Sequence, residues 1–181
     1  MADNSTPIES ERRIATVMFA DISGFTAMSE KMDPEQVTCV MNDCFCMMGD
    51  CIEKHGGTID KFIGDCVMVL FGVPKALEDA PQKAVNAAIE IRNRLYKFNK
   101  DKDLSIPLNI HIGINTGPVV SGMVGSDQKQ EFTVMGDTVN LASRIEGASQ
   151  VGQILVGPAT YKATKTGFKY KTLPHIALKG K

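Results

Sequence analysis

The sequence predicts an α+β fold of the split βαβ type, in which helices back an open sheet. The first observation is the order of segments, because apolar stretches typical of buried strands alternate with amphipathic stretches typical of helices. The second is length, since 181 residues suffice for one domain with a sizeable core but not for two ordinary ones. We therefore predict one domain over residues 12–181, preceded by a disordered polar tail over residues 1–11.

The first strand and the first helix follow directly from the residues. The apolar stretch RIATVMFAD predicts a buried strand that ends at Asp21. Farther along, Asp33 is a candidate N-cap, Pro34 suits the first helical position, and Gln36 is placed to reach back to the cap. This helix is predicted to run to about His55, because apolar residues recur at three- and four-residue steps: Val37, Met41, Cys44, Met48 and Cys51.

The rest of the chain supplies the remaining strands and helices. GTIDKFIGDCVMVLFG predicts a hairpin with its tip near Gly64 and Asp65, and a second helix follows over about residues 79–99. LNIHIGINTGPVVSGMVG is interpreted as a strand pair, EFTVMGD as a short strand, and DTVNLASRIEGAS as a short helix. QILVGPATYKAT predicts a strand leading into a helical turn, and FKYKTLP a weak edge strand. This order is that of a ferredoxin-like split βαβ sandwich with additional strands and helices.

Charge and hydropathy exclude several classes of function. The net charge is −1, from 20 basic and 21 acidic side chains spread along the chain, which offers no footprint for nucleic acid or an anionic membrane. No apolar run approaches the roughly 20 residues of a spanning helix, and the first residues lack the apolar core of a signal peptide. We therefore expect a cytoplasmic chain without membrane contact. Because ALKGK ends the sequence without a closing element, we also expect flanking regulatory domains in a longer parent protein.

Cysteine usage is consistent with a reducing compartment. Four of the five cysteines fall within the first predicted helix: Cys39, Cys44, Cys46 and Cys51. Their spacings match no zinc or redox motif, so they are interpreted as small buried hydrophobic side chains.

Two aspartates are the first candidates for chemistry. Asp21 ends a buried strand, and Asp65 lies in the tip of a hairpin that a split antiparallel sheet places beside that strand end. Two carboxylates brought together at a sheet rim repel each other unless they share a proton or bind a cation. Oxygen ligands without a nearby His or Cys suit Mg²⁺ or Mn²⁺, and Mg²⁺ usually needs phosphate oxygens to complete its shell. Either Asp alone is equally well explained as a solvated strand end or turn residue.

Two further stretches suit phosphate binding. ISGFT follows Asp21 and joins a flexible Gly to the start of a helix, where backbone N–H groups can bind phosphate. Asn140 and Arg144 lie four residues apart on one face of a predicted helix, with Ser143 at the three-residue step. An amide and a guanidinium aimed at one spot suit a phosphoryl group that gains charge in its transition state. A solvated helix face would explain the same pair.

Four stretches together resemble the catalytic domain of the class III adenylyl and guanylyl cyclases. They are FADISGFT, GGTIDKFIGDCVMVLFG, HIGINTGPVVSGMVGS and TVMGDTVNLASRIE, in the order and spacing of that family, and the resemblance covers about residues 11–181. It implies conversion of a nucleoside triphosphate to its 3′,5′-cyclic monophosphate and pyrophosphate. It also implies a head-to-tail homodimer whose interface forms shared active sites.

The resemblance assigns a role to each candidate. Asp21 and Asp65 match the ligands of two divalent metal ions, Mg²⁺ or Mn²⁺, and the Ile22 carbonyl commonly completes one shell. Asn140 and Arg144 match the pair that stabilises the transition state. The phosphate-binding turn corresponds to Ile22, Ser23, Gly24, Phe25 and Thr26.

Lys61 and Thr133 match the positions that read the purine. Many adenylyl cyclases of the family carry Asp in place of Thr133, whereas a Lys and Thr pair resembles the bicarbonate-responsive soluble subgroup and implies bicarbonate as a further partner. Lys61 can donate to adenine N1, and the Thr133 hydroxyl can accept from the N6 amine. The pair therefore favours ATP, with a guanylyl cyclase as the alternative.

Other readings compete with catalysis. A non-catalytic regulatory domain would bind nucleotide or bicarbonate and signal through its dimer, but it would not need the complete set of site residues. A diguanylate cyclase or a polymerase palm also uses two carboxylates and two metals, but lacks the Asn140 and Arg144 motif. A purely structural interaction module would not need charges at the sheet rim.

Overall fold

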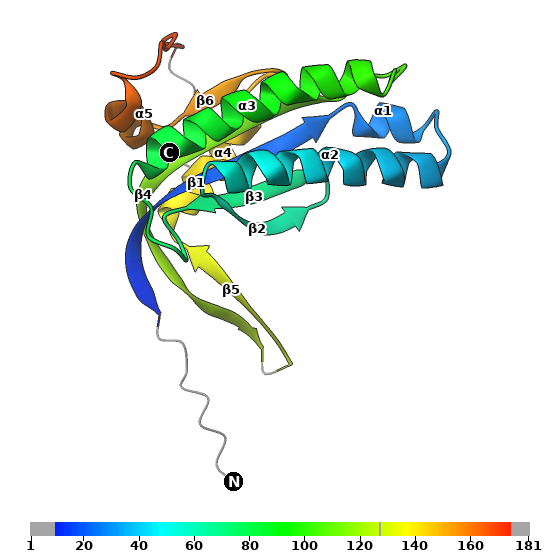
Figure 1. Cartoon of the computed structure of the whole chain (residues 1–181). Helices are drawn as coiled ribbons and strands as arrows, with labels where there is room; N and C mark the ends of the chain where they lie inside the picture. The colour runs from blue at the N-terminus through cyan, green and yellow to red at the C-terminus, as the bar shows by residue number, and fades with distance from the viewer. Residues whose placement is uncertain (1–9, 127, 175–181) are drawn as a thin grey trace.

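Helices and a single sheet build the molecule in layers. The computed structural model describes residues 10–126 and 128–174. Within these residues the strands form one six-stranded sheet, in the order β2-β3-β1-β4-β5 with β6 pairing to β4, which confirms the predicted α+β fold (Figure 1). The strands are β1 Glu11–Ser23, β2 Thr58–Ile63, β3 Cys66–Phe71, β4 Asn109–Ser126, β5 Lys129–Met135 and β6 Ile154–Val156. The helices are α1 Phe25–Ser29, α2 Pro34–Lys54, α3 Ala80–Asp101, α4 Asp137–Gly147 and α5 Pro158–Thr164.

Both faces of the sheet are covered. Side chains along β1 alternate, so that Met18, Ala20 and Ile22 pack in the core that α2 and α3 share. Val17 and Phe19 point to the opposite face, in a second buried cluster that includes Ala142 of α4. Since Asp21 follows Phe19 by two residues, its side chain lies on the α4 face.

The two long helices form where the sequence predicts them. The predicted apolar face of α2 is buried against the sheet, and Pro34 occupies its first turn. Asp33 precedes the helix as predicted, but its side chain makes no capping hydrogen bond, so the proposed cap is wrong in its chemistry. Cys44 and Cys51 are buried, whereas Cys39 and Cys46 are exposed, because the helix turns only one face to the core.

Three other expectations need correction. Residues 109–126, interpreted as a strand pair, form the single long strand β4. The stretch FKYKTLP is not a strand within the described residues. The predicted tail overlaps the sheet, because β1 begins at Glu11, two residues earlier than the stretch chosen from the sequence; residues 1–9 lie outside the described residues.

The described helices also bear on membrane contact. Within residues 10–126 and 128–174, no helix combines the length and hydropathy that a bilayer span requires.

Candidate active site

The two predicted metal ligands lie at the same end of the sheet, Asp21 on strand β1 and Asp65 in the turn between β2 and β3. Asp21 on the central strand β1 is paired with Cys66 of β3 on one side and with His111 of β4 on the other. The β2–β3 turn folds back beside it, and the backbone N–H of Ile22 donates to the Asp65 carbonyl at 3.2 Å. The turn thus holds the Asp65 carboxyl close enough to Asp21 for the two charges to interact.

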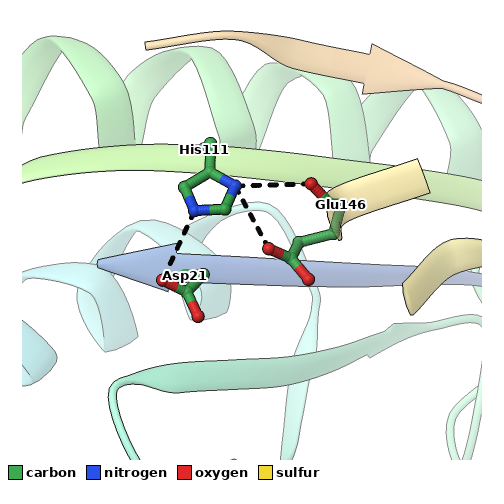
Figure 2. A group of neighbouring side chains, drawn as sticks. All are labelled: Asp21, His111 and Glu146. Atoms are coloured by element: carbon green, nitrogen blue, oxygen red, sulfur yellow. Dashed lines mark hydrogen bonds and ion pairs between the residues drawn. The ribbon is translucent and has the colours of Figure 1, made fainter. Parts of the chain in front are cut away.

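A histidine links Asp21 to helix α4, as Figure 2 shows. His111 Nε2 lies 3.4 Å from Asp21 Oδ1, and His111 Nδ1 lies 3.1 Å from Glu146 Oε1. The same Nδ1 is 3.0 Å from Ser149 Oγ and 3.3 Å from the Glu146 carbonyl. The imidazole therefore lies between two carboxyl groups, one from the sheet and one from the helix.

The electrostatics of this cluster follow from burial and from like charges. Burial raises the pKa of the Asp21 carboxyl above its ordinary value, the negative charge of Asp65 raises it further, and His111 opposes both. Burial likewise raises the pKa of Glu146, with His111 lowering it and both aspartates raising it. A cation bound here would stabilise the ionised forms of Asp21 and Glu146, whose pKa values burial and neighbouring negative charges raise.

The residues present suit a divalent metal ion. Asp21, His111 and Glu146 each offer one ligand atom, and these atoms lie within 4.8 Å of one another. The Asp21 and Asp65 carboxyl oxygens are the ligand type that Mg²⁺ and Mn²⁺ prefer. The mutual repulsion of these two carboxyl groups is the observation that fits such an ion.

The predicted phosphate-binding turn contains regular secondary structure. Ile22 and Ser23 still belong to β1, and Gly24 is the N-cap of the short helix α1 with φ +99°. A Cβ on Gly24 would lie 2.9 Å from the Pro107 carbonyl oxygen, so a side chain is excluded by both conformation and space. The Ser23 hydroxyl is buried and, among the described residues, has no hydrogen-bond partner.

The predicted transition-state pair projects from α4. Asn140 is exposed and Arg144 is half-buried. Among the described residues neither side chain forms a hydrogen bond or an ion pair, so neither is joined in this way to Asp21 or Asp65. Both side chains are therefore available to a ligand.

The predicted base-reading residues are brought together by a third one. Thr133 lies on β5 and Lys61 on β2, which are opposite edges of the sheet in its pairing order. The Thr133 hydroxyl donates to Asp60 Oδ2 at 2.8 Å, and Lys61 Nζ lies 3.3 Å from the same oxygen. Asp60 is thus the link between the two edge strands.

The sequence predictions did not include Asp60, His111 or Glu146. The position of His111 is signalled only by strand pairing, which sets it directly opposite Asp21. Asp60 is adjacent to Lys61 in a hairpin whose only other charged residue is Asp65, and this third charge was the available signal.

A separate hollow lies away from these side chains. Apolar residues of α4, β6 and α5 line a cavity of about 580 Å³, among them Leu141, Val156 and Tyr161. None of the predicted site residues lines it, so it is not the candidate active site.

Comparison with known proteins gives the context of this geometry. The family model described as "Adenylate and Guanylate cyclase catalytic domain" matches residues 8–181. "Adenylate cyclase 1" of Rhizobium meliloti is 34% identical over 174 residues, covering 94% of this chain and 26% of that protein. The adenylate cyclase of Anabaena cylindrica is 41% identical over 147 residues, covering 78% of this chain and 28% of that protein. The chain therefore spans about a quarter of the length of these two relatives.

Solved structures show the same fold. The adenylyl cyclase CyaB from P. aeruginosa superposes with a TM-score of 0.89 at 39% identity, covering 95% of this chain and 90% of that one. The guanylyl cyclase Cya2 superposes with a TM-score of 0.79 at 42% identity, covering 85% and 79%. An adenylyl cyclase and a guanylyl cyclase are thus both similar to this chain. The choice between adenine and guanine must therefore be argued from the residues of this chain.

Proposed function

We propose, because this chain belongs to the adenylate and guanylate cyclase catalytic-domain family, that it converts ATP to 3′,5′-cyclic AMP and pyrophosphate. The observation that carries the proposal is the pair of neighbouring carboxyl groups on Asp21 and Asp65. They lie at the sheet rim, where burial and the negative charge of Asp65 raise the pKa of the Asp21 carboxyl. Such a pair is suited to hold divalent cations beside a triphosphate.

The proposed roles follow from the chemistry of each side chain. Asp21 and Asp65, with the Ile22 carbonyl, would hold two Mg²⁺ or Mn²⁺ ions, and the turn from Ile22 to Thr26 would bind phosphate. When bound, such ions supply Lewis-acid chemistry, which lowers the pKa of a coordinated hydroxyl and neutralises phosphate charge. Arg144 donates to the α-phosphate as negative charge grows there. Asn140 orients the ribose so that its 3′-hydroxyl faces the α-phosphorus in line with the departing pyrophosphate.

The base-reading residues favour adenine. Lys61 donates to an acceptor at N1, which adenine has and guanine lacks because its N1 carries a proton. Thr133 accepts from the adenine N6 amine, whereas guanine offers an O6 acceptor at that place. Both contacts therefore match ATP, whereas with GTP the Lys61 contact is mismatched and the Thr133 hydroxyl would have to donate.

We also propose that two copies of the chain share each active site head to tail. Within one chain, Lys61 and Thr133 lie at the β2 and β5 edges, and no hydrogen bond or ion pair among the described residues joins them to Asp21. Exposed apolar side chains lie on the same edge strands, namely Phe62, Ile63 and Met135, each about half exposed. A partner copy that covers these side chains would bring its own metal ligands to the base-reading residues.

One experiment tests the proposal directly. The purified chain is incubated with ATP or GTP, with Mg²⁺ or Mn²⁺, and with or without bicarbonate, and the cyclic products are quantified. We expect cyclic AMP in excess over cyclic GMP, and stimulation by bicarbonate if the Lys61 and Thr133 pair marks the responsive subgroup. The Asp21→Ala variant should be nearly inactive while keeping its fold by circular dichroism. Magnesium-dependent turnover by that variant would reject the metal-ligand assignment, and cyclic GMP as the main product would reject the choice of purine.

A further inference from the structure

Asp60 occupies an irregular position in strand β2. Ile59 pairs with Val69 and Lys61 pairs with Met68, so Asp60 is an extra residue without its own partner in β3. Such a bulge turns side chains away from the strict alternation of a strand, and bulges of this kind often lie beside active sites. Here it allows two consecutive residues, Asp60 and Lys61, to place their charged groups 3.3 Å apart.

The Asp60 carboxylate is buried, and one of its oxygens contacts two neighbouring side chains. Its side chain is 2% exposed, and a single oxygen, Oδ2, contacts both Lys61 Nζ and the Thr133 hydroxyl. A buried carboxylate needs partners of this kind, because an unpaired charge in the interior costs far more than a paired one. The contact also joins the two edge strands of the sheet, β2 and β5, which come close because the sheet curls (Figure 1).

The hydrogen bond from Thr133 has a consequence for base reading. A hydroxyl has one proton, and a free threonine hydroxyl rotates to donate or accept as its partner demands. In this structure the Thr133 proton is directed to Asp60 Oδ2, at 2.8 Å, which leaves only the oxygen lone pairs for a ligand. Thr133 thereby becomes an acceptor alone, which matches the adenine N6 amine and opposes the guanine O6 atom.

The ion pair acts on Lys61 in a parallel way. The ammonium has three donor protons on a flexible stem, so its direction is normally poorly fixed. Asp60 Oδ2 lies 3.3 Å from the ammonium nitrogen and so fixes the place of that group beside the Thr133 hydroxyl. The ammonium protons are donors, which match adenine N1 and oppose the N1–H of guanine.

We propose that Asp60 is a positioning residue that sets the preference for adenine by fixing Thr133 as an acceptor and Lys61 as a donor. The inference rests on the proposed function, since it concerns the same nucleotide. It adds a determinant that does not itself contact the base.

The test compares the ratio of kcat/KM for ATP to kcat/KM for GTP in the purified protein and its variants. Asp60→Ala should lower this ratio about tenfold to hundredfold, the usual effect of losing a hydrogen bond to a charged group. Most of the loss should appear in KM for ATP, because Asp60 lies at the base and not at the reacting phosphate. Asp60→Asn keeps the volume and removes the charge, so its ratio should lie between those of wild type and Asp60→Ala.

A double variant shows whether Asp60 acts through Thr133. Thr133→Val should lower the ratio by itself, and adding Asp60→Ala to it should lower the ratio by less than Asp60→Ala does in the wild-type protein, since only the effect through Lys61 remains. Thr16→Val is the matched control, because it removes a fully buried hydroxyl that bonds to Thr116 at 2.9 Å in the same sheet. The control should keep the wild-type ratio even if its melting temperature falls.

The outcomes separate this proposal from the function on which it rests. If Asp60→Ala lowers turnover of both nucleotides equally and leaves the ratio unchanged, the role of Asp60 is merely structural and the proposal is wrong. If wild type makes no cyclic nucleotide, the proposed function fails, and affinities for ATP and GTP are measured by titration calorimetry. A wild-type preference for ATP that disappears in Asp60→Ala would still support the positioning role. The positioning role would be overturned if wild type bound ATP and GTP equally well, or if its preference for ATP persisted in Asp60→Ala.

Discussion

At the scale of single residues, His111 favours the ionised form of two carboxyl groups at the candidate metal site. It lies between the Asp21 carboxyl on β1 and the Glu146 carboxyl on α4. Both carboxyl groups have pKa values raised by burial, and His111 opposes the shift in each. In the metal-free protein the imidazole therefore offsets part of the repulsion that a bound cation would remove.

The raised pKa of Glu146 predicts a pH-dependent stability. Its pKa in the folded state lies above the ordinary 4.5 of the unfolded chain, so the folded protein binds the proton more tightly. The tighter proton binding stabilises the folded protein, and this stabilisation is fully present below about pH 4.5 and is lost as pH rises through the folded-state pKa of Glu146. In Glu146→Gln that loss is absent, so the free energy of unfolding should fall less between pH 4.5 and pH 7.

Urea unfolding of both proteins in the presence of a chelator measures this difference. Asp21 also has a raised pKa, and it is present in both proteins, so the comparison reports Glu146 together with its coupling to Asp21. Two stability curves that stay parallel over this range would contradict the shift assigned to Glu146.

At the scale of elements, the position of α4 depends on a glycine in the strand beneath it. A Cβ at Gly113 of β4 would lie 2.2 Å from the backbone nitrogen of Glu146 and 2.7 Å from the carbonyl oxygen of Ala142. Both of these are backbone atoms, which cannot rotate away as a side chain could. The absence of a side chain at Gly113 therefore lets α4 lie directly on β4 and bring Glu146 to His111.

Gly113→Ala should lift α4 away from the sheet. We expect the free energy of unfolding to fall by about 1–3 kcal/mol or more, the usual cost of overpacking. Activity should fall as well, since α4 also bears Asn140 and Arg144. Gly147→Ala is the matched control on the same helix, because a Cβ there has no atom within 4 Å, and it should change stability by less than about 1 kcal/mol. Equal melting temperatures for the two variants would contradict this account of how α4 is positioned.

The same contacts show what the sequence could and could not predict. The apolar spacing of α2 and the turn at Gly64 were sufficient to predict a helix and a hairpin, and with them the neighbourhood of Asp21 and Asp65. The stretch that forms β4 was predicted wrongly, because it was interpreted as a strand pair and is one continuous strand. Within that strand Gly117 allows the Thr138 side chain to approach, since a Cβ at Gly117 would lie 2.6 Å from the Thr138 hydroxyl.

Asp60 shows why part of the site was missed. Its role depends on a bulge and on the approach of β5 from the other edge of the sheet. Neither feature has a local signature in the sequence, because both arise from pairing between distant segments. The order of the predicted strands was sufficient to bring Asp21 and Asp65 together, whereas the positions of Asp60, His111 and Glu146 depend on pairing that the sequence does not reveal.

At the scale of the whole molecule, the candidate functional side chains of one chain form two separate groups. Asp21, His111 and Glu146 form one group between the sheet and α4, and Asp60, Lys61 and Thr133 form the other between the two edge strands. Among the described residues no hydrogen bond or ion pair connects the groups. This separation is what a site shared between two copies of the chain requires, since each copy would supply one group to each site.

Complementation between two inactive variants tests that division. Arg144→Ala alone should reduce kcat about 10²- to 10³-fold, as the loss of one preorganised donor does, and a loss under tenfold would reject its role. Asp21→Ala alone should be nearly inactive. If one copy supplies Asp21 and Asp65 to a site and the other copy supplies Lys61, Asn140 and Arg144, then in a mixed dimer one site receives both substitutions and the other receives neither. Random exchange should therefore restore about a quarter of wild-type activity, because half of the dimers are mixed and each has one intact site.

The control distinguishes a shared site from a simple gain in stability. Asp21→Ala mixed with Asp65→Ala should give no recovery, because both substitutions remove ligands from the same group and every site in the mixture lacks one. Mass spectrometry of differently tagged chains establishes that mixed dimers have formed. If verified mixed dimers of Asp21→Ala and Arg144→Ala stay inactive, each site lies within one chain. The separation of the two groups would then require a movement of α4 and the β2 edge instead of a second copy.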